Sequence, residues 1–130
     1  MIFFDTSAAL ALIDQRDPNH HSASDVFRRH VDTSLFVTHN YVVLETVALL
    51  QRRLGIAAVR AFVERLLPLL AVRWVDAQQY ERAMVDLLAL RRRQVSLVDR
   101  VSFGLMRDSQ IRTAFAFDRD FTREGFKLLD

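Results

Sequence analysis

The 130-residue chain is predicted to adopt an α/β fold of three layers, with a mainly parallel five-stranded sheet between helices. Short apolar runs alternate along the chain with longer segments of amphipathic, helical periodicity. Parallel strands need such helical crossovers and are buried on both faces. The composition suits a packed core, since 51% of the residues are hydrophobic and only 3 Gly and 2 Pro occur. We expect one domain over residues 1–130.

The amino-terminal part contains two predicted strands and two predicted helices. Residues 2–4 form an apolar run that stops at Asp-Thr-Ser, and this polar turn can cap a helix over residues 8–13. The Asp-Pro pair at 17–18 breaks the chain before a second helix at residues 20–31. Residues 35–37 are apolar, with an aromatic and a β-branched side chain, and have strand composition.

The middle of the chain contains two helices and one strand. The first helix is predicted over residues 39–54 and ends at Gly55, whose missing Cβ suits the left-handed conformation of a helix stop. The second covers residues 56–67 and is halted by Pro68. Strand composition returns at residues 71–75.

The carboxyl-terminal part again alternates helix and strand. Residues 77–93 are amphipathic and carry three arginines in the last turn, where cations complement the helix dipole. A short helix at residues 97–107 follows Ser96. Residues 113–117 form the fourth strand, and residues 126–129 form an edge strand.

Composition excludes several kinds of protein. The chain has no cysteine, so disulfides, thiolate zinc sites and thiol nucleophiles are excluded. No apolar run approaches the roughly 18 residues of a membrane span and no signal peptide is recognised, so we expect a cytoplasmic protein without a membrane partner. Eighteen basic and 16 acidic residues leave a net charge of only +2, so the distribution of charge matters more than its sum.

Two aspartates directly follow predicted strands. Asp5 comes after residues 2–4, and Asp118 comes after residues 113–117. In an open α/β sheet the ligand site lies outside the carboxyl ends of the strands, so both side chains are expected there. Capping of the following helix or turn explains each aspartate equally well. Asp120, two residues further on, either reaches the same space or points to solvent.

Glu45 and Asp99 are acidic residues in apolar surroundings. The neighbours of Glu45 three and four positions away are apolar or aromatic, and no Lys or Arg lies within one turn. A carboxylate there needs a cation, a hydrogen bond or a proton, and pairing with a distant arginine is the structural alternative. Asp99 stands three residues after Ser96, which is typical of a capping box, yet valine and leucine surround it.

Together the acidic residues suggest one metal site, made by Asp5, Glu45, Asp99 and Asp118. Because only oxygen ligands are on offer, Mg²⁺ or Mn²⁺ is favoured over zinc, and such ions commonly bind substrate phosphate. The chemistry expected is metal-assisted hydrolysis of a phosphodiester. Thr6 or Ser7 can hold a carboxylate or a metal-bound water in place, or can simply cap the helix.

Four segments resemble the PIN-domain ribonucleases, and among these the VapC toxins of toxin–antitoxin pairs. They are IFFDTSAALAL, VVLETVALL, VSLVDRVSF, and AFAFDRDF with the GFKLL that follows it. The likeness extends from residue 2 to about residue 129, and 40, 54 and 19 residues separate the four acids. Each motif is short, but their order and separations make the combined match specific.

The resemblance implies a metal-dependent endoribonuclease that acts as a growth-inhibiting toxin, cleaves RNA to inhibit translation and leaves 5′-phosphate and 3′-hydroxyl ends. It implies that the four acids bind Mg²⁺ or Mn²⁺, that Thr6 and Ser7 are the polar pair after the first acid, and that Asp120 is secondary. It also implies strand order 3-2-1-4-5, a homodimer, and an antitoxin that inserts a basic side chain into the acidic groove. Val98 and Phe117 depart from the family by replacing common polar residues, which bears on metal affinity or rate.

Positive charge is expected around an acidic pocket that binds RNA. We predict that Arg100, Arg112 or Arg119 contacts phosphate, while a solvated face with local salt bridges is the alternative for each. If metal neutralises the four acids, the rest of the chain carries a net charge of about +6. The four histidines lack metal-ligand spacing, so we assign them no catalytic role.

Two other functions fit these residues. An aspartate at the end of the first strand can accept a phosphoryl group, but the single lysine, Lys127, lies at the far terminus. A non-catalytic PIN-like module could instead keep the fold for binding RNA or a protein partner. The presence of all four acids argues against the second alternative.

Overall fold

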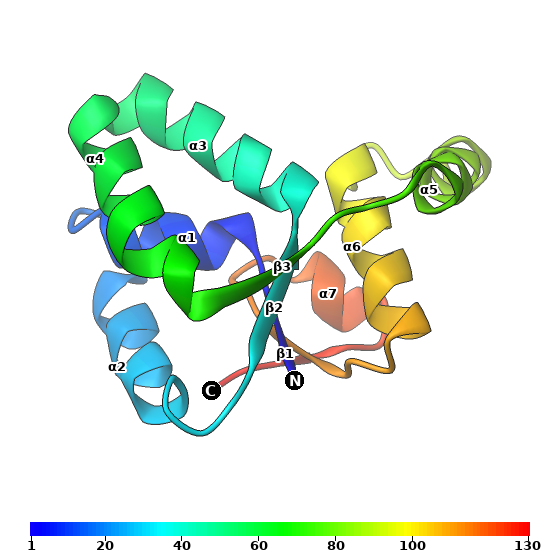
Figure 1. Cartoon of the computed structure of the whole chain (residues 1–130). Helices are drawn as coiled ribbons and strands as arrows, with labels where there is room; N and C mark the ends of the chain where they lie inside the picture. Colours follow the sequence, from blue (N-terminus) through cyan, green and yellow to red (C-terminus); the bar gives the residue numbers. More distant parts are fainter.

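A computed structural model describes all 130 residues and contains a five-stranded sheet with helices on both faces (Figure 1). The strand order is β3-β2-β1-β4-β5, and every neighbouring pair is parallel. The strands are β1 (Ile2–Phe4), β2 (Phe36–His39), β3 (Leu70–Arg73), β4 (Thr113–Phe115) and β5 (Lys127–Leu128). The expected fold class and strand order are confirmed.

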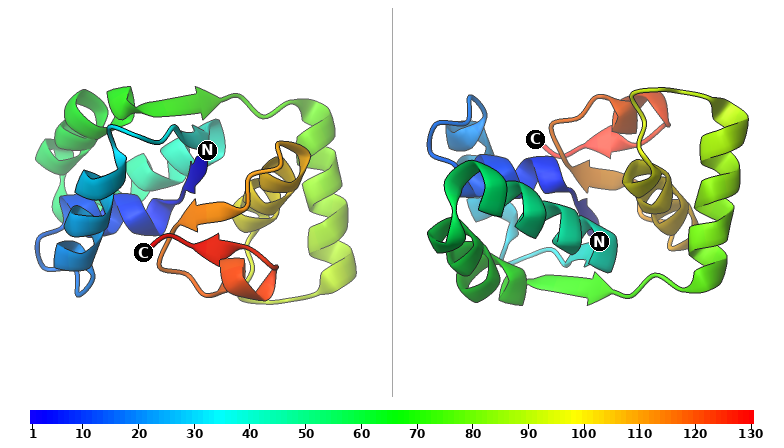
Figure 2. Two further views of the ribbon diagram at one scale, coloured as in Figure 1. Left: turned by 90° about the horizontal axis from the view of Figure 1, so that it is seen from below. Right: turned by 90° about the horizontal axis from the view of Figure 1, so that it is seen from above.

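The helices form two groups on opposite sides of the sheet (Figure 2). In chain order they are α1 (Thr6–Ile13), α2 (His20–His30), α3 (Asn40–Leu54), α4 (Ile56–Ala61), α5 (Ala77–Leu90), α6 (Leu97–Asp108) and α7 (Asp120–Arg123). Helices α1 to α4 cover one face, α6 and α7 cover the other, and α5 lies outside α6. None of them combines the length and apolarity needed to cross a membrane.

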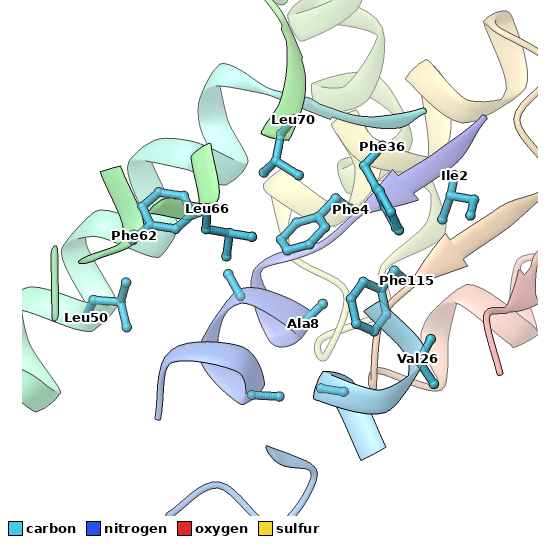
Figure 3. Packing of buried hydrophobic residues seen from close by; sticks show 13 residues of the cluster. Ile2, Phe4, Ala8, Val26, Phe36, Leu50, Phe62, Leu66, Leu70 and Phe115 are labelled. Atoms are coloured by element: carbon cyan, nitrogen blue, oxygen red, sulfur yellow. The ribbon is translucent and has the colours of Figure 1, made fainter. Parts of the chain in front are cut away.

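Each face of the sheet has its own apolar core, because successive strand residues point to opposite faces. Phe4, Phe36 and Phe115 face α1 to α4, and their rings lie 5.5 to 6.0 Å apart (Figure 3). Phe3 and Val37, one position away, belong to the second cluster with residues of α6 and α7. Both faces are therefore sealed by large side chains from the central strands.

The helix predicted at residues 56–67 is the element that differs most from expectation. It begins as α4, widens into a π-helical turn over Phe62–Leu66, and tightens into a 3₁₀ turn over Leu67–Leu69. Phe62 and Leu66 are both buried within the π turn. Pro68, near the start of the 3₁₀ turn, has no N–H to continue the earlier ladder. This proline accounts for the end of the helical ladder in the segment.

Several expected elements are shorter than predicted. The fourth strand ends at Phe115 instead of residue 117, because the Phe117 N–H leaves the sheet to donate to Ser7 Oγ at 2.9 Å. Helix α5 ends at Leu90, where Arg91 adopts a left-handed conformation with φ of 51°. The four-residue helix α7 was not expected, since it falls in the predicted loop between the last two strands.

Replacement of Phe115 by alanine tests the aromatic core beneath the sheet. Phe115 is 1% exposed and contacts Phe4 and Phe36, so Phe115→Ala should lower the free energy of unfolding by about 3–5 kcal/mol. Leu88→Ala, on a side chain 69% exposed, should stay within about 0.5 kcal/mol. Urea denaturation measures both. A similar small loss in the two variants would contradict the packing described.

Candidate metal centre

The carboxyl ends of β1 and β4 leave the sheet side by side. Phe4 pairs with Phe115, so the residues that follow both strands emerge at the same level. The Asp5 N–H continues the contact by donating to the Phe115 carbonyl at 3.1 Å. This edge receives Asp5 from the first strand and the segment from Ala116 to Asp120 from the fourth.

Asp5 is buried and caps helix α1. Its Oδ2 accepts hydrogen bonds from the Ser7 N–H at 3.1 Å and from Ser7 Oγ at 2.6 Å. Burial raises the pKa of Asp5 to about 6, although the hydrogen bonds from Ser7 oppose the rise. The negative charges of Asp99 and Glu45 raise it further. Capping is therefore confirmed, and it leaves this carboxylate without a cation.

Ser7 connects the two strand ends that carry acids. Its hydroxyl donates to Asp5 and accepts the Phe117 N–H, directly before Asp118. Thr6 is buried beside it, and its Oγ1 accepts a hydrogen bond from Thr46 Oγ1 at 3.2 Å. Thr46 is the neighbour of Glu45 on α3, so this threonine pair fixes α3 against the start of α1.

Glu45 is half-buried and contributes negative charge to the same space. Its charge acts on both Asp5 and Asp99. No arginine or lysine lies within ion-pair distance of its carboxylate, so the pairing considered as the alternative is not observed. Helix α3 thus brings a carboxylate to the site without bringing its counter-charge.

Asp99 both caps its helix and faces the acidic cluster. Asp99 Oδ2 accepts the Ser96 N–H at 2.9 Å, and the Asp99 N–H donates to Ser96 Oγ at 3.1 Å, which completes the predicted capping box. Burial raises the pKa of Asp99 despite these bonds, and the charges of Asp118 and Glu45 add to the rise. Its capping role and its place in the cluster are compatible.

Asp118 and Asp120 follow β4 and lie close to Asp99. Carboxylate oxygens of Asp99, Asp118 and Asp120 all lie within 4.8 Å of one another. The Asp120 N–H donates to Asp118 Oδ1 at 2.9 Å, which holds the two aspartates together. Asp120 is 4% exposed, so it points into the shared space and not to solvent.

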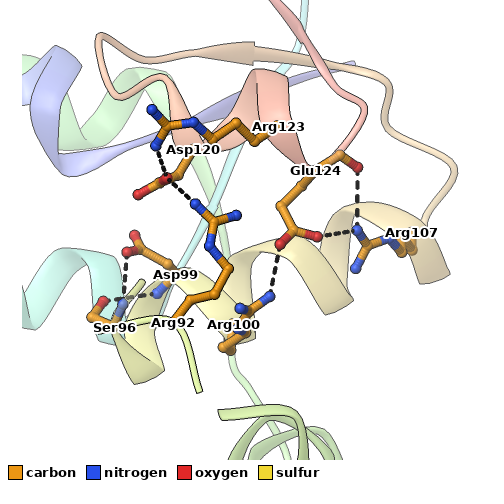
Figure 4. Close-up of polar contacts among 8 residues, drawn as sticks. All are labelled: Arg92, Ser96, Asp99, Arg100, Arg107, Asp120, Arg123 and Glu124. Atoms are coloured by element: carbon orange, nitrogen blue, oxygen red, sulfur yellow. Dashed lines mark hydrogen bonds and ion pairs between the residues drawn. The ribbon is translucent and has the colours of Figure 1, made fainter. Parts of the chain in front are cut away.

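The donors and charges of this cluster suit a hard divalent cation. Every donor is a carboxylate or hydroxyl oxygen, as Mg²⁺ and Mn²⁺ prefer. Asp5 and Asp99 are desolvated enough to hold protons more tightly than usual, yet neither forms an ion pair. Only Asp120 has cationic partners, namely Arg92 at 3.4 Å and Arg123 at 2.9 Å (Figure 4). A cation would supply the missing charge.

The three arginines predicted to contact phosphate have different surroundings. Arg100 is 3% exposed and pairs with Glu124 at 2.7 Å, so its prediction as a phosphate contact is wrong: the guanidinium is needed inside the fold. Arg112 is exposed but precedes β4, at the opposite edge of the sheet. Arg119 is exposed and adjoins Asp118 and Asp120. Lys127 pairs in register with Thr113, also far from the acids, which disfavours phosphotransfer at Asp5.

Arg92, Arg123 and His39 are site-related residues that sequence reasoning missed. Arg92 belongs to a loop whose path no local pattern indicates, although the spacing of Asp120 and Arg123 is that of a helical ion pair. His39 is the cap of α3, where its Nδ1 accepts the N–H groups of Tyr41 and Val42. A histidine is an uncommon helix cap, so the usual signal was absent.

A buried hydrogen-bond chain starting at His39 ties α3 to α6. With Nδ1 accepting, the proton lies on Nε2, which donates to Ser102 Oγ at 2.9 Å. Ser102 Oγ donates in turn to the Val98 carbonyl at 3.0 Å, directly before Asp99. Burial lowers the pKa of His39 to about 4, in keeping with a neutral ring. The chain fixes the helix bearing Glu45 against the helix bearing Asp99.

Removal of the Ser102 hydroxyl should loosen this connection. Ser102→Ala leaves the buried His39 Nε2–H without an acceptor, so we expect the free energy of unfolding to fall by about 1–3 kcal/mol. Ser22→Ala, at an exposed position of α2, should change it by less than about 0.5 kcal/mol. Chemical denaturation at neutral pH gives both values. Equal stability of the two variants would argue against the chain.

Asp5→Asn should stabilise the metal-free protein at neutral pH. The folded pKa of Asp5 is raised to about 6 from 3.8, so the folded chain binds more protons than the unfolded chain between those values, and stability falls as pH rises. The variant should exceed the wild type by on the order of 2–3 kcal/mol at pH 7.5 in EDTA, with the difference closing near pH 4.

Asp32→Asn is the matched control, because Asp32 is exposed and its side chain forms no ion pair. Denaturation over the pH range compares the three proteins. Addition of Mn²⁺ should stabilise the wild type more than Asp5→Asn. A less stable Asp5→Asn at pH 7.5 in EDTA would contradict the electrostatic account.

Comparison with known proteins agrees with this geometry. Residues 2–127 match the PIN domain family. The chain is 39% identical over 127 residues to the 23S rRNA-specific endonuclease VapC20 of Mycobacterium tuberculosis, covering 97% of this chain and 95% of that protein. The crystal structure of M. tuberculosis VapC20, described as a sarcin–ricin loop cleaving toxin, superposes with a TM-score of 0.88 at 36% identity and covers 97% and 96% of the two chains.

A more distant structure shares the fold alone. FitAcB from Neisseria gonorrhoeae superposes with a TM-score of 0.70 at 14% identity, over 100% of this chain and 97% of that one. The match to the PIN family spans nearly the whole chain, and the similarity to VapC20 extends over nearly the full length of both proteins. The chain therefore belongs to the PIN-domain family and, within it, to the VapC endoribonuclease toxins.

Proposed function

We propose that this VapC-type chain cleaves the sarcin–ricin loop of 23S ribosomal RNA and depends on Mg²⁺ or Mn²⁺. The observation that carries the metal requirement is the group of carboxylates from the ends of β1 and β4 and from helices α3 and α6, of which four lack any cationic partner. The substrate is proposed from the 39% identity to VapC20. Cleavage there would stop translation, as expected of a toxin.

In this proposal Asp5, Glu45, Asp99 and Asp118 hold the metal. When bound, the ion would polarise a phosphoryl oxygen and make a coordinated water more acidic. Ser7 orients Asp5 through two hydrogen bonds and keeps one carboxylate oxygen engaged. The Ser96 N–H engages one carboxylate oxygen of Asp99 through a single hydrogen bond. The unengaged oxygens are then left to face the reaction, and hydrolysis would yield 5′-phosphate and 3′-hydroxyl ends.

Most side chains next to the four acids keep helices and strand ends in position and take no part in proton transfer. Thr6 is buried and accepts a hydrogen bond from Thr46, so it acts through the position of α1. Val98 and Phe117 offer no side-chain hydroxyl to the acids that follow them. Their backbone groups still connect the site, since the Phe117 N–H donates to Ser7 and the Val98 carbonyl accepts from Ser102.

The chain is also proposed to act as a homodimer and to be inhibited by a cognate antitoxin. Large apolar side chains remain exposed outside the two cores, including Leu44 at 66% and Trp74 at 80%. Apolar surface of this kind supports contact with protein partners. An antitoxin side chain of positive charge would complement the four unpaired acids.

Glu45→Gln separates a metal ligand from a structural residue. We expect cleavage of a sarcin–ricin hairpin RNA in Mg²⁺ to fall by roughly 100-fold or more, since removal of even outer partners of a metal site costs 10- to 100-fold. The melting temperature should not fall, because Glu45 forms no ion pair and its charge repels Asp5 and Asp99. Single-turnover cleavage and thermal melting provide the two readouts.

Glu81→Gln, on an exposed residue of α5, is the matched control and should keep full activity. EDTA should abolish cleavage by the wild type, and the Asp99→Asn variant should fail to cleave in Mg²⁺. Cleavage that persists in EDTA would overturn the metal requirement. Failure of the wild type to cut any RNA, with no Mn²⁺ binding by calorimetry, would favour a non-catalytic binding module.

A further inference from the structure

Two arginines from separate segments converge on the carboxylate of Asp120 (Figure 4). Arg92 comes from the loop between α5 and α6, and Arg123 comes from the last residue of α7. A terminal nitrogen of each lies near the same oxygen, Oδ1, at 3.4 Å for Arg92 and 2.9 Å for Arg123. Asp120 is 4% exposed, so the two guanidinium groups are anchored on a buried acid.

The charges around Asp120 do not cancel. The two guanidinium groups exceed by one positive charge the single carboxylate that they contact. An oxygen of this same carboxylate lies within 4.8 Å of oxygens of Asp99 and Asp118. A positive group is thus fixed directly beside a negative cluster that lacks cations. Such a juxtaposition suits a ligand that carries negative charge and is acted on by a metal.

Both guanidinium groups retain hydrogen-bonding capacity. Each has five N–H donors, and its recorded ion pair with Asp120 uses one. The side chains are 37% exposed for Arg92 and 59% for Arg123. Arg123 also lines a surface hollow of about 420 Å³ together with Arg119, Thr122 and Leu128. In contrast, Arg100 is buried against Glu124 and offers nothing to solvent.

We propose that Arg92 and Arg123, anchored on Asp120, form a clamp for a backbone phosphate of the RNA next to the bond that is cut. The planar fork of a guanidinium matches phosphate oxygens, and an anchored fork loses less freedom when it binds. Asp120 is then a positioning residue for the two arginines and not a metal ligand. The proposal rests on the proposed ribonuclease function and deepens it.

RNA affinity in EDTA tests the clamp without cleavage. Arg92→Gln and Arg123→Gln are compared with Arg93→Gln, an exposed arginine of the same loop that forms no ion pair. All three variants lose one positive charge, so long-range attraction changes equally. Fluorescence anisotropy is measured at several salt concentrations with a sarcin–ricin hairpin and with an unrelated single-stranded RNA of the same length.

Each clamp variant should weaken binding of both RNAs by roughly tenfold relative to Arg93→Gln, as expected for a lost charge-assisted hydrogen bond. The slope of log K against log salt on the single strand should fall by about 0.7. Arg92→Lys, which keeps the charge but loses the fork, should recover only part of the affinity. Clamp variants that behave like Arg93→Gln would overturn the proposal.

Asp120→Asn tests the anchor. The variant makes the chain more positive by one unit, so simple attraction predicts tighter RNA binding, whereas loss of the anchor predicts weaker binding. Mn²⁺ affinity, measured by calorimetry, should fall by no more than about tenfold, the Coulomb effect of one charge lost near the ion, and a larger loss would show that Asp120 is a metal ligand and overturn its assignment. Melting curves verify that the Asp120→Asn variant is folded. If it does not fold, the Arg92 and Arg123 variants, which change exposed side chains, still test the clamp.

The two RNAs separate this proposal from the function on which it rests. If the wild type fails to cut the sarcin–ricin hairpin while both clamp variants still weaken binding of both RNAs, the substrate is wrong and the clamp stands. If cleavage occurs and the clamp variants match Arg93→Gln, the clamp alone is wrong.

Discussion

The Ser7 hydroxyl holds together the ends of two strands that both deliver negative charge. It donates to Asp5 after β1 and accepts the backbone N–H of Phe117 after β4, so neither segment can move without the other. The bond to Phe117 also ends β4 and turns the chain toward Asp118, Asp120 and α7. Together with the bond from the Asp5 N–H to the Phe115 carbonyl, this hydroxyl fixes where Asp5 and Asp118 leave the sheet.

The site is built against the electrostatic preference of the folded chain. Burial and mutual repulsion raise the pKa values of Asp5 and Asp99, which means that the fold holds these carboxylates where their ionised forms are unfavourable. Capping bonds from Ser7 and Ser96 recover part of that cost. A divalent cation would recover more, so metal affinity and fold stability are coupled in the same set of side chains.

Sequence reasoning located the acids because each obeys a local rule. Asp5 and Asp118 follow apolar strands, Glu45 interrupts an apolar helix face, and Asp99 completes a capping box. Their roles as metal ligands stay a prediction. These rules concern neighbours within one helix or strand. They do not predict the burial of Arg100, because Arg100 pairs with Glu124, a residue 24 positions away.

The features that escaped prediction all depend on tertiary contacts. Helix α7 is four residues long and has no periodicity to detect, and it forms where the Asp120 N–H bonds to Asp118. The approach of Arg92 to Asp120 requires the loop after α5 to return across the site, which no spacing indicates. The π turn over Phe62–Leu66 has no signal in the sequence, because Phe62 and Leu66 would share one buried face of a regular α-helix equally well.

Folding releases a proton from His39 and takes one up at Asp5, so the two groups have opposite effects on the pH dependence of stability. The pKa of His39 is lowered to about 4, so folding releases a proton from His39 between about pH 4 and 6.5, and stability from this group rises with pH. Asp5 takes up a proton on folding over almost the same range, with the opposite slope. The two groups therefore nearly cancel in the metal-free chain. A bound cation keeps Asp5 ionised in the folded chain, so Asp5 no longer takes up a proton on folding. The stability of the metal-loaded protein should then fall as the pH drops from about 6.5 to 4, because the contribution of His39 is no longer offset.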